Sequence, residues 1–309
     1  MKVIFKNVGQ ADSLIIKWQF DSKDKYGIID CAKYEGRIPT ITYLEEEKVK
    51  EISFIILSHP HFDHCSGLFE LLEHCERENI LIKGFYHTSS TAPSYINYSE
   101  YNQNSRVKLF NILRKVESMY AQKKIIKSGC IGLDWDSPLT KDIRLKCLSP
   151  SDYERKTFVS KIDYHKDTSE YQCSMAANYL STVFKIYDST GNYILLTSDA
   201  VQPSFERLLD RHADDFRGEL RLGQVPHHGS EKNHHSSFWD SLLKRAKCPA
   251  VVSVGNKYNH PSYNVVDSFY QSGFNVDLTK GRFIKTSTSL DLVSKLTNAK
   301  GSDLEYSFP

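Results

Sequence analysis

Residues 54–64 of the chain read Phe54-Ile55-Ile56-Leu57-Ser58-His59-Pro60-His61-Phe62-Asp63-His64. The apolar, β-branched run at its start is typical of a buried strand, and sites in α/β proteins lie just beyond the carboxyl ends of strands. Because residues two apart in an extended chain point the same way, His59 and His61 can bind one ion. Asp63 and His64, beyond a bend, can reach a second ion beside it. The segment therefore predicts a metal centre at a strand end.

The types of ligand narrow the choice of metal. Imidazole and carboxylate without thiolate suit zinc, manganese or iron. The alternative is that these side chains belong to a solvated loop. In a chain of 309 residues with 12 histidines, this spacing arises by chance on the order of once in a thousand chains. The metal site is the favoured interpretation, because the spacing also has a mechanism.

The composition is that of an ordinary globular protein, with 40% apolar and 25% charged residues and a net charge of +2. That charge is too small to indicate nucleic-acid binding by itself. We find no run long enough for a membrane span and no signal peptide, so no membrane partner is expected. The seven cysteines are scattered without framework spacing, which fits reduced thiols and a cytoplasmic location. Nothing in the sequence indicates a protein partner.

Other apolar runs also end in possible ligands. They place Asp30, Asp199, the pair His227 and His228, and His260 at or just beyond strand ends. A buried acid at such a position can orient a ligating histidine, which is the role expected of Asp30. Five strand ends of this kind predict a single metal centre at one edge of a layered sheet.

The periodicity predicts a single domain over residues 1–309, with an insert at about 88–130 and a candidate lid loop at about 151–172. Within the insert, residues 106–127 are expected to form one helix. Its polar face includes Lys123, Lys124 and Lys127, which could follow a phosphate backbone. A solvated basic face is the alternative, and the sequence alone favours it. Helices are also expected over 40–50, 204–212, 236–247 and 265–271, and a frayed tail after two last strands.

Several motifs together resemble the metallo-β-lactamase superfamily. They are Val8-Gly9-Gln10-Ala11-Asp12-Ser13, His59-x-His61-x-Asp63-His64, Leu195-Leu196-Thr197-Ser198-Asp199-Ala200, Pro226-His227-His228-Gly229-Ser230, and Ser253-Val254-Gly255-Asn256 through His260-Pro261. The last two are similar to the branch that includes the soluble domain of the competence protein ComEC and phosphorylcholine esterase. Ala11 and Ser198 replace glycines of the family pattern. A histidine expected some twenty residues before the bridging acid is missing, and Asn178 stands near that place.

The resemblance implies an αβ/βα sandwich, an α/β fold of four layers, with two divalent metal ions, Zn²⁺ or Mn²⁺, at one edge. It puts His59, His61 and one of His227 and His228 on the first ion. It puts Asp63, His64 and His260 on the second, with Asp199 bridging, and a carboxylate can bridge two cations where an imidazole cannot.

The same resemblance implies a hydroxide nucleophile shared by the two ions. Asp63, His227 and His228 are the expected catalytic residues, and the histidine of the pair that is not a ligand would stabilise or protonate the leaving group. Lys232 and Asn256 are further candidates for binding substrate.

Three functions stay open on the sequence. The first is a phosphodiesterase or nuclease, whose substrate is a phosphodiester and possibly nucleic acid. The second is a hydrolase of another ester, such as a phosphocholine-type diester, a thioester or a lactone, because fold alone does not choose a substrate. The third is a non-catalytic, metal-stabilised sensing or scaffold module.

Overall fold

The structure is a computed structural model that describes residues 1–88, 103–162, 175–255, 259–281 and 301–308. Its helices are α1 (Pro39–Glu46), α2 (Phe62–Cys65), α3 (Leu68–Arg77), α5 (Gln103–Ala121), α6 (Asp152–Lys161), α8 (Gln202–His212), α9 (Ser236–Ser241) and α10 (Tyr263–Gln271), with 3-10 helices η1 (Asn178–Leu180), η2 (Ala213–Phe216) and η3 (Pro226–Gly229). Its strands are β1 (Lys2–Phe5), β2 (Leu14–Phe20), β3 (Lys23–Ile29), β4 (Glu51–Ile52), β5 (Phe54–Leu57), β6 (Leu81–His87), β7 (Ile125–Cys130), β8 (Asp136–Pro138), β9 (Ile143–Ser149), β10 (Val183–Asp188), β11 (Tyr193–Leu196), β12 (Leu220–Gln224), β13 (Cys248–Val252), β14 (Phe274–Leu278) and β15 (Leu304–Ser307).

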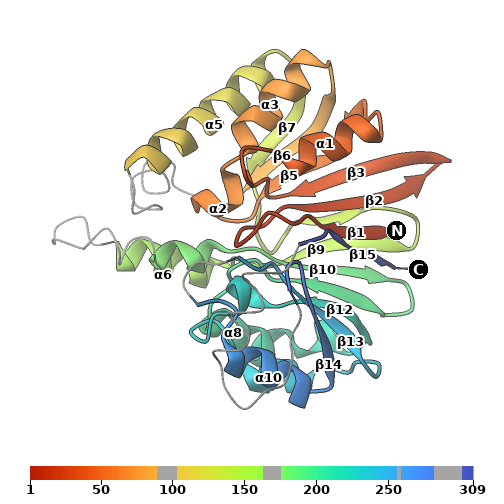
Figure 1. The fold of residues 1–309 in the computed structure, drawn as a ribbon, viewed down its shortest axis with the longest axis vertical. Coiled ribbons are helices and arrows are strands. Elements are labelled where there is room, and N and C mark those ends of the chain that lie inside the picture. The colour runs from red at the N-terminus through yellow and green to blue at the C-terminus, as the bar shows by residue number, and fades with distance from the viewer. Residues whose placement is uncertain (89–102, 163–174, 256–258, 282–300, 309) are drawn as a thin grey trace.

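The strands form two sheets that face each other, with helices on the outer side of each (Figure 1). The first sheet has the order β15-β1-β2-β3-β5-β6-β4, with β7 paired to β6, and α1, α3 and α5 cover it. The second has the order β14-β13-β12-β11-β10-β9-β8, covered by α8, α9 and α10. This mixed α/β arrangement of two sheets between helical layers confirms the predicted fold class.

The alternation of side chains along the strands explains the layers. Phe54 and Ile56 of β5 pack between the two sheets, whereas Ile55 and Leu57 pack under the helices of the first layer. Strand β11 repeats the pattern, because its successive side chains also point to opposite apolar faces. A strand that is buried on both faces needs the continuous apolar run seen in the sequence.

Parallel pairing places the strand ends together. In the first sheet β3 pairs in parallel with β5, and in the second β11, β12 and β13 are parallel neighbours. The carboxyl ends of these strands therefore meet at one edge of the sandwich, where α2 lies in Figure 1.

The helix expected over residues 106–127 ends earlier than predicted. Helix α5 stops at Ala121, Lys123 has a left-handed φ of 59°, and Ile125 begins β7, which pairs in parallel with β6. Good helix formers continue past residue 121, so local propensity did not reveal the pairing that ends the helix. The described part of the expected insert belongs to the first helical layer and sheet, and residues 89–102 lie outside the described residues.

The expected lid loop is wrong over its first half, because residues 152–161 form α6. Ser151 and Glu154 make the capping box of this helix, which is a signal that the sequence carries. Residues 163–174 lie outside the described residues. Helix α9 ends at Ser241 rather than at 247. Residues 304–307 of the expected frayed tail form β15, which pairs with β1 at the edge of the first sheet, and residues 282–300 lie outside the described residues. No helix within the described ranges is long and apolar enough to cross a membrane.

Candidate metal centre

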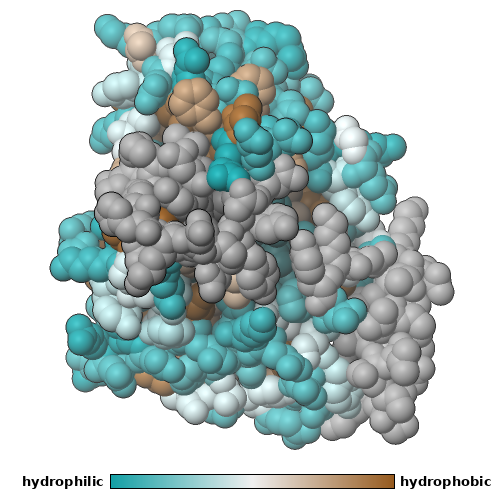
Figure 2. All heavy atoms as spheres, turned by 90° about the vertical axis from the view of Figure 1, so that its left-hand side faces the viewer, coloured by the Kyte–Doolittle hydropathy of each residue, from teal (hydrophilic) through white to brown (hydrophobic). Residues whose placement is uncertain are grey.

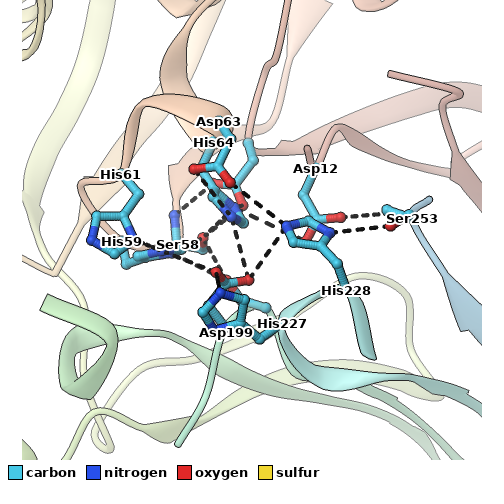
Figure 3. A network of polar contacts seen from close by, with 12 residues as sticks. Asp12, Ser58, His59, His61, Asp63, His64, Asp199, His227, His228 and Ser253 are labelled. Carbon is cyan, nitrogen blue, oxygen red and sulfur yellow. Dashed lines mark hydrogen bonds and ion pairs between the residues drawn. The ribbon is translucent and has the colours of Figure 1, made fainter. Parts of the chain in front are cut away.

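The strand ends bring imidazoles and carboxylates to one place between the sheets (Figure 3). From the first sheet, the turn after β5 and the start of α2 supply His59, His61, Asp63 and His64. From the second sheet, the turn after β11 supplies Asp199, and η3 after β12 supplies His227 and His228.

The two oxygens of the Asp199 carboxylate face two separate groups of side chains. Its Oδ1 atom lies 3.4 Å from His64 Nε2 and 3.8 Å from His228 Nε2. Asp63 completes this set, which we call the Oδ1 group, with all ligand atoms within 4.8 Å of one another.

The other oxygen, Oδ2, lies 3.4 Å from His227 Nε2 and 3.7 Å from His59 Nε2. His59 Nε2 is in turn 3.0 Å from His61 Nδ1. These three histidines are the Oδ2 group. Asp199 thus stands between two sets of nitrogen atoms.

These distances and the lack of other partners fit a metal. Two nitrogen ligands at about 2.0–2.1 Å from a tetrahedral zinc ion would lie about 3.3 Å apart, close to the separations seen here. His64 Nε2, His228 Nε2 and Asp199 Oδ1 are buried and have no hydrogen-bond partner among the residues that the structure describes. Buried polar atoms without partners are costly, so three of them aimed at one another are best explained by a cation between them.

Hydrogen bonds to the opposite ring nitrogens orient the Oδ1 group. His64 Nδ1 lies 2.7 Å from Asp30 Oδ2, and His228 Nδ1 lies 3.2 Å from the Ser253 carbonyl oxygen. Both partners accept from these rings, so each Nδ1 carries a proton, and Nε2 is the nitrogen that can offer its lone pair to a metal once any proton on it is lost. Asp30 also accepts hydrogen bonds from the amide and the hydroxyl of Ser58. Asp30 therefore makes the contact expected of it from the sequence.

The Oδ2 group is held by neutral groups. His59 Nδ1 lies 3.2 Å from Ser58 Oγ and 3.3 Å from Ser198 Oγ. His227 Nδ1 lies 3.4 Å from the side-chain amide of Asn178, the residue noted near the missing histidine. In this orientation the Asn178 side-chain oxygen is buried and has no partner among the described residues. If the amide nitrogen and oxygen exchange places, the oxygen faces His227 Nδ1 and can accept a hydrogen bond from it.

The charges around the centre shift its pKa values in opposite directions. Burial would lower the pKa of His228, but Asp199, Asp63 and Asp12 outweigh it and raise that pKa to about 9. Burial lowers the pKa of His227, with only partial compensation by Asp199. Burial opposes ionisation of Asp199, yet His227, His64 and His228 keep its pKa well below the usual value.

Residues 20–99 match the family model described as the metallo-beta-lactamase superfamily. The matched residues include the His59–His64 segment of the candidate metal centre. Similar solved structures include a diphosphatase from the PhnP family, with 11% identity, a TM-score of 0.47 and coverage of 100% of this chain and 98% of that chain. Others are the metallo-beta-lactamase fold protein YhfI from Bacillus subtilis (10%, 0.47, 99% and 100%) and an isothiocyanate hydrolase from Delia radicum gut bacteria (12%, 0.44, 93% and 100%). No curated protein sequence matches the chain. The match over residues 20–99 agrees with the superfamily resemblance seen in the sequence, and the branch stays a prediction.

The geometry differs from the expected ligand division at one point. His228, not His260, lies with Asp63 and His64. His260 stands beside His227, with ring centroids 5.8 Å apart, and burial together with His227 and His228 lowers its pKa to about 4. The ligand roles themselves stay predictions.

The backbone of η3 allows both histidines to reach the centre. His227 and His228 have left-handed φ values of 47° and 54°, which non-glycine residues seldom adopt in succession. Gly229 follows at φ +84°, and a Cβ there would approach the Pro261 Cα to 2.9 Å. Such strained backbone is commonly retained at functional sites.

A buried polar network beneath the candidate metal centre was missed from the sequence. Asp12 accepts hydrogen bonds from Gln224 at 2.8 Å and from the Ser253 hydroxyl at 2.6 Å. The side-chain oxygen of Gln224 accepts from the amides of Thr197 and Ser198, and so fixes the turn that carries Asp199. The Gly9–Asp12 turn drew attention only through its motif, because its partners lie more than 200 residues away along the chain.

The structure does not gather all predicted substrate residues at the centre. Lys124 pairs with Glu76 at 2.9 Å beyond the end of α5, and Lys127 lies on β7. Lys108 of α5 lies over the ring of Phe62, the residue between His61 and Asp63. At a rise of about 1.5 Å per residue, the last residue of α5 is about 20 Å along the helix axis from Lys108, away from these ligands. Lys232 is exposed on the turn after η3, and Asn256 lies outside the described residues.

Proposed function

We propose that the chain is a dinuclear metal-dependent hydrolase that cleaves phosphodiesters. The observation that supports it best is the position of Asp199, with one carboxylate oxygen facing the Oδ1 group and the other facing the Oδ2 group. In this proposal His59, His61 and His227 would hold one divalent ion, Zn²⁺ or Mn²⁺. Asp63, His64 and His228 would hold the other, and Asp199 would bind both.

Two divalent ions at such a site supply a water-derived nucleophile at neutral pH and polarise the phosphoryl oxygen. The residues of the chain fix the ligands and shape the approach. Asp30 and the Ser253 carbonyl hold the imidazoles of the Oδ1 group in the tautomer that ligation needs. Gln224 and Asn233 hold the Asp199 turn, Asn233 by donating to the backbone carbonyls of Asp199 and Ala200. The carboxylate therefore needs little reorganisation during the reaction.

The choice of a phosphodiester is supported by the sequence resemblance of two segments, 226–230 and 253–261, to the phosphodiesterase-like branch. The fold alone does not select this substrate, because the same centre could serve other esters. The substrate test must therefore include them.

The test is an assay of protein loaded with Mn²⁺ or Zn²⁺ on bis(p-nitrophenyl) phosphate, single- and double-stranded nucleic acid, and a thioester. We expect phosphodiester hydrolysis, and a loss on the order of a thousandfold in Asp199→Ala, because that variant removes the ligand shared by both ions. Asp188→Ala is a matched control, since this acid caps the turn at the other end of the β10–β11 hairpin.

Hydrolysis that survives Asp199→Ala would contradict the bridged centre. Preferred cleavage of the thioester would replace the phosphodiester proposal by that of another ester hydrolase. Stoichiometric metal binding without turnover of any substrate would favour a non-catalytic module.

A further inference from the structure

The candidate ligands are not equally accessible from solvent. The side chains of His59, His64, His228 and Asp199 are at most 2% exposed. Asp63 is 39% exposed and His227 is 22% exposed, and His61 is partly exposed. A substrate must therefore approach over Asp63, His61 and His227, on the side where α5 and α6 extend in Figure 1.

On one side of this approach, helix α5 places a lysine over the metal-binding turn. The Lys108 ammonium lies 4.4 Å from the centre of the Phe62 ring, and Phe62 stands between His61 and Asp63 in the sequence. The next residue, Leu109, is fully buried in the first-layer core, so the helix that carries Lys108 is fixed. A cation–π contact favours this position of an exposed ammonium.

On the other side, helix α6 places a second lysine in the same way. The Lys161 ammonium lies 5.4 Å from the centre of the Tyr179 ring. Tyr179 follows Asn178, whose amide contacts His227. Phe158 and Ile162 of the α6 region are buried in the core that also contains Leu109, so α5 and α6 are anchored in one cluster.

Neither ammonium forms an ion pair with any residue that the structure describes. Each ammonium is held by an aromatic ring, Phe62 next in sequence to His61 and Asp63, and Tyr179 next in sequence to the Asn178 that contacts His227, and each is left available for an anion. Around the atoms drawn in grey, the face toward which α5 and α6 extend is mostly hydrophilic (Figure 2).

We propose that Lys108 and Lys161 bind phosphates on the two sides of the bond that is cleaved, so that the substrate is an oligonucleotide-type phosphodiester. This inference rests on the proposed function. Two bound divalent ions would offset the charge of the reacting phosphate, so Lys108 and Lys161 would serve a substrate that carries further negative charge. A choline-type diester would bring its own cation to these ammonium groups, and a lactone or thioester would leave them without a partner.

The experiment compares Lys108→Met, Lys161→Met and the double variant on two substrates. A short labelled oligonucleotide has flanking phosphates, and bis(p-nitrophenyl) phosphate has none. For the oligonucleotide we expect KM to rise about five- to tenfold for each lysine with kcat little changed, and the salt dependence to fall by about 0.7–0.9 in log–log slope per lysine. For the small diester kcat/KM should stay within about twofold.

Lys50→Met is the matched control, because this exposed lysine precedes β4 at the end of the sheet opposite the ligands. An unchanged oligonucleotide KM in the double variant, or equal losses on both substrates, would overturn the inference.

Oligonucleotide binding to Asp199→Asn, measured by fluorescence anisotropy, separates this inference from the proposed function. Lysine-dependent binding without turnover by the wild type would keep the phosphate contacts and reject the hydrolase. Oligonucleotide turnover that is unchanged by both lysine substitutions would keep the proposed hydrolase and reject the phosphate contacts.

Discussion

The two groups of histidines around Asp199 differ in what fixes them. In the Oδ1 group, the rings of His64 and His228 are buried, and their Nδ1 atoms donate to the Asp30 carboxylate and the Ser253 carbonyl, which serve as hydrogen-bond acceptors. In the Oδ2 group, His61 and His227 are partly exposed, and the contacts of His59 and His227 are hydroxyls and an amide. The comparison teaches that the histidines on one side of the centre are oriented before any metal binds, whereas two histidines on the other side are partly open to solvent.

The largest effect is expected from Asp30→Asn. The amide can present a donor to His64 Nδ1, which would move the ring proton to Nε2 and oppose metal binding by the Oδ1 group. Loss of such a partner typically costs 10–100-fold in metal affinity. Competition with a chelator would measure the affinity of each ion, and Asp24→Asn, on an exposed acid, is the control. If Asp30→Asn lowered metal affinity only at the Oδ2 group, the view that Asp30 organises the Oδ1 group would be wrong.

The next effect concerns pH. In the metal-free protein the pKa of His228 is raised to about 9 and that of His227 is lowered. Below pH 9 a metal must therefore displace a proton from His228, and affinity should rise about tenfold per pH unit for each displaced proton until the pH passes that pKa.

Calorimetry at pH 7 in buffers of different ionisation enthalpy measures this release. We expect His227→Ala to retain the proton release and His228→Ala to lose its share. Metal binding with no proton release at pH 7 would contradict the assignment of pKa values.

The smallest effect is expected from Asn178→Ala. The hydrogen bond between neutral groups is worth about 0.5–1.5 kcal/mol, so affinity of the Oδ2 group should fall only about three- to tenfold. Asn178→Asp should restore or exceed the wild-type affinity, because a carboxylate accepts from His227 Nδ1. A hundredfold loss in Asn178→Ala would show that both groups depend equally on their contacts.

The position of the centre was predictable from the sequence because it depends on local patterns. An apolar run ending in His59 or Asp199 reports a strand end, and parallel pairing then brings the ends together. Which histidine belongs to the Oδ1 group and which to the Oδ2 group could not be predicted from the sequence. His228 reaches the Oδ1 group through consecutive left-handed residues, which residue spacing does not reveal.

The other features were not predicted because they depend on contacts between residues that are far apart in the sequence. Asp12 and Gln224 are 212 residues apart and show no shared pattern. The end of α5 depends on the pairing of Ile125 with Ile82, while the lysines around it are compatible with helix. By contrast, Ser151 and Glu154 did carry the signal for α6, which the polar composition of the segment hid.

Helix α6 has a consequence for motion. Its Phe158 side packs into the core of the first layer, and its buried Glu154 pairs with Arg207 of α8 in the second at 2.5 Å. Breaking such a buried pair is strongly unfavourable. The helix thus fastens both halves of the sandwich beside the entrance, so amide hydrogen exchange in α6 should be as slow as in the central strands. At the part of the entrance that α6 forms, the width should therefore stay constant, and fit against this helix should contribute to discrimination between substrates.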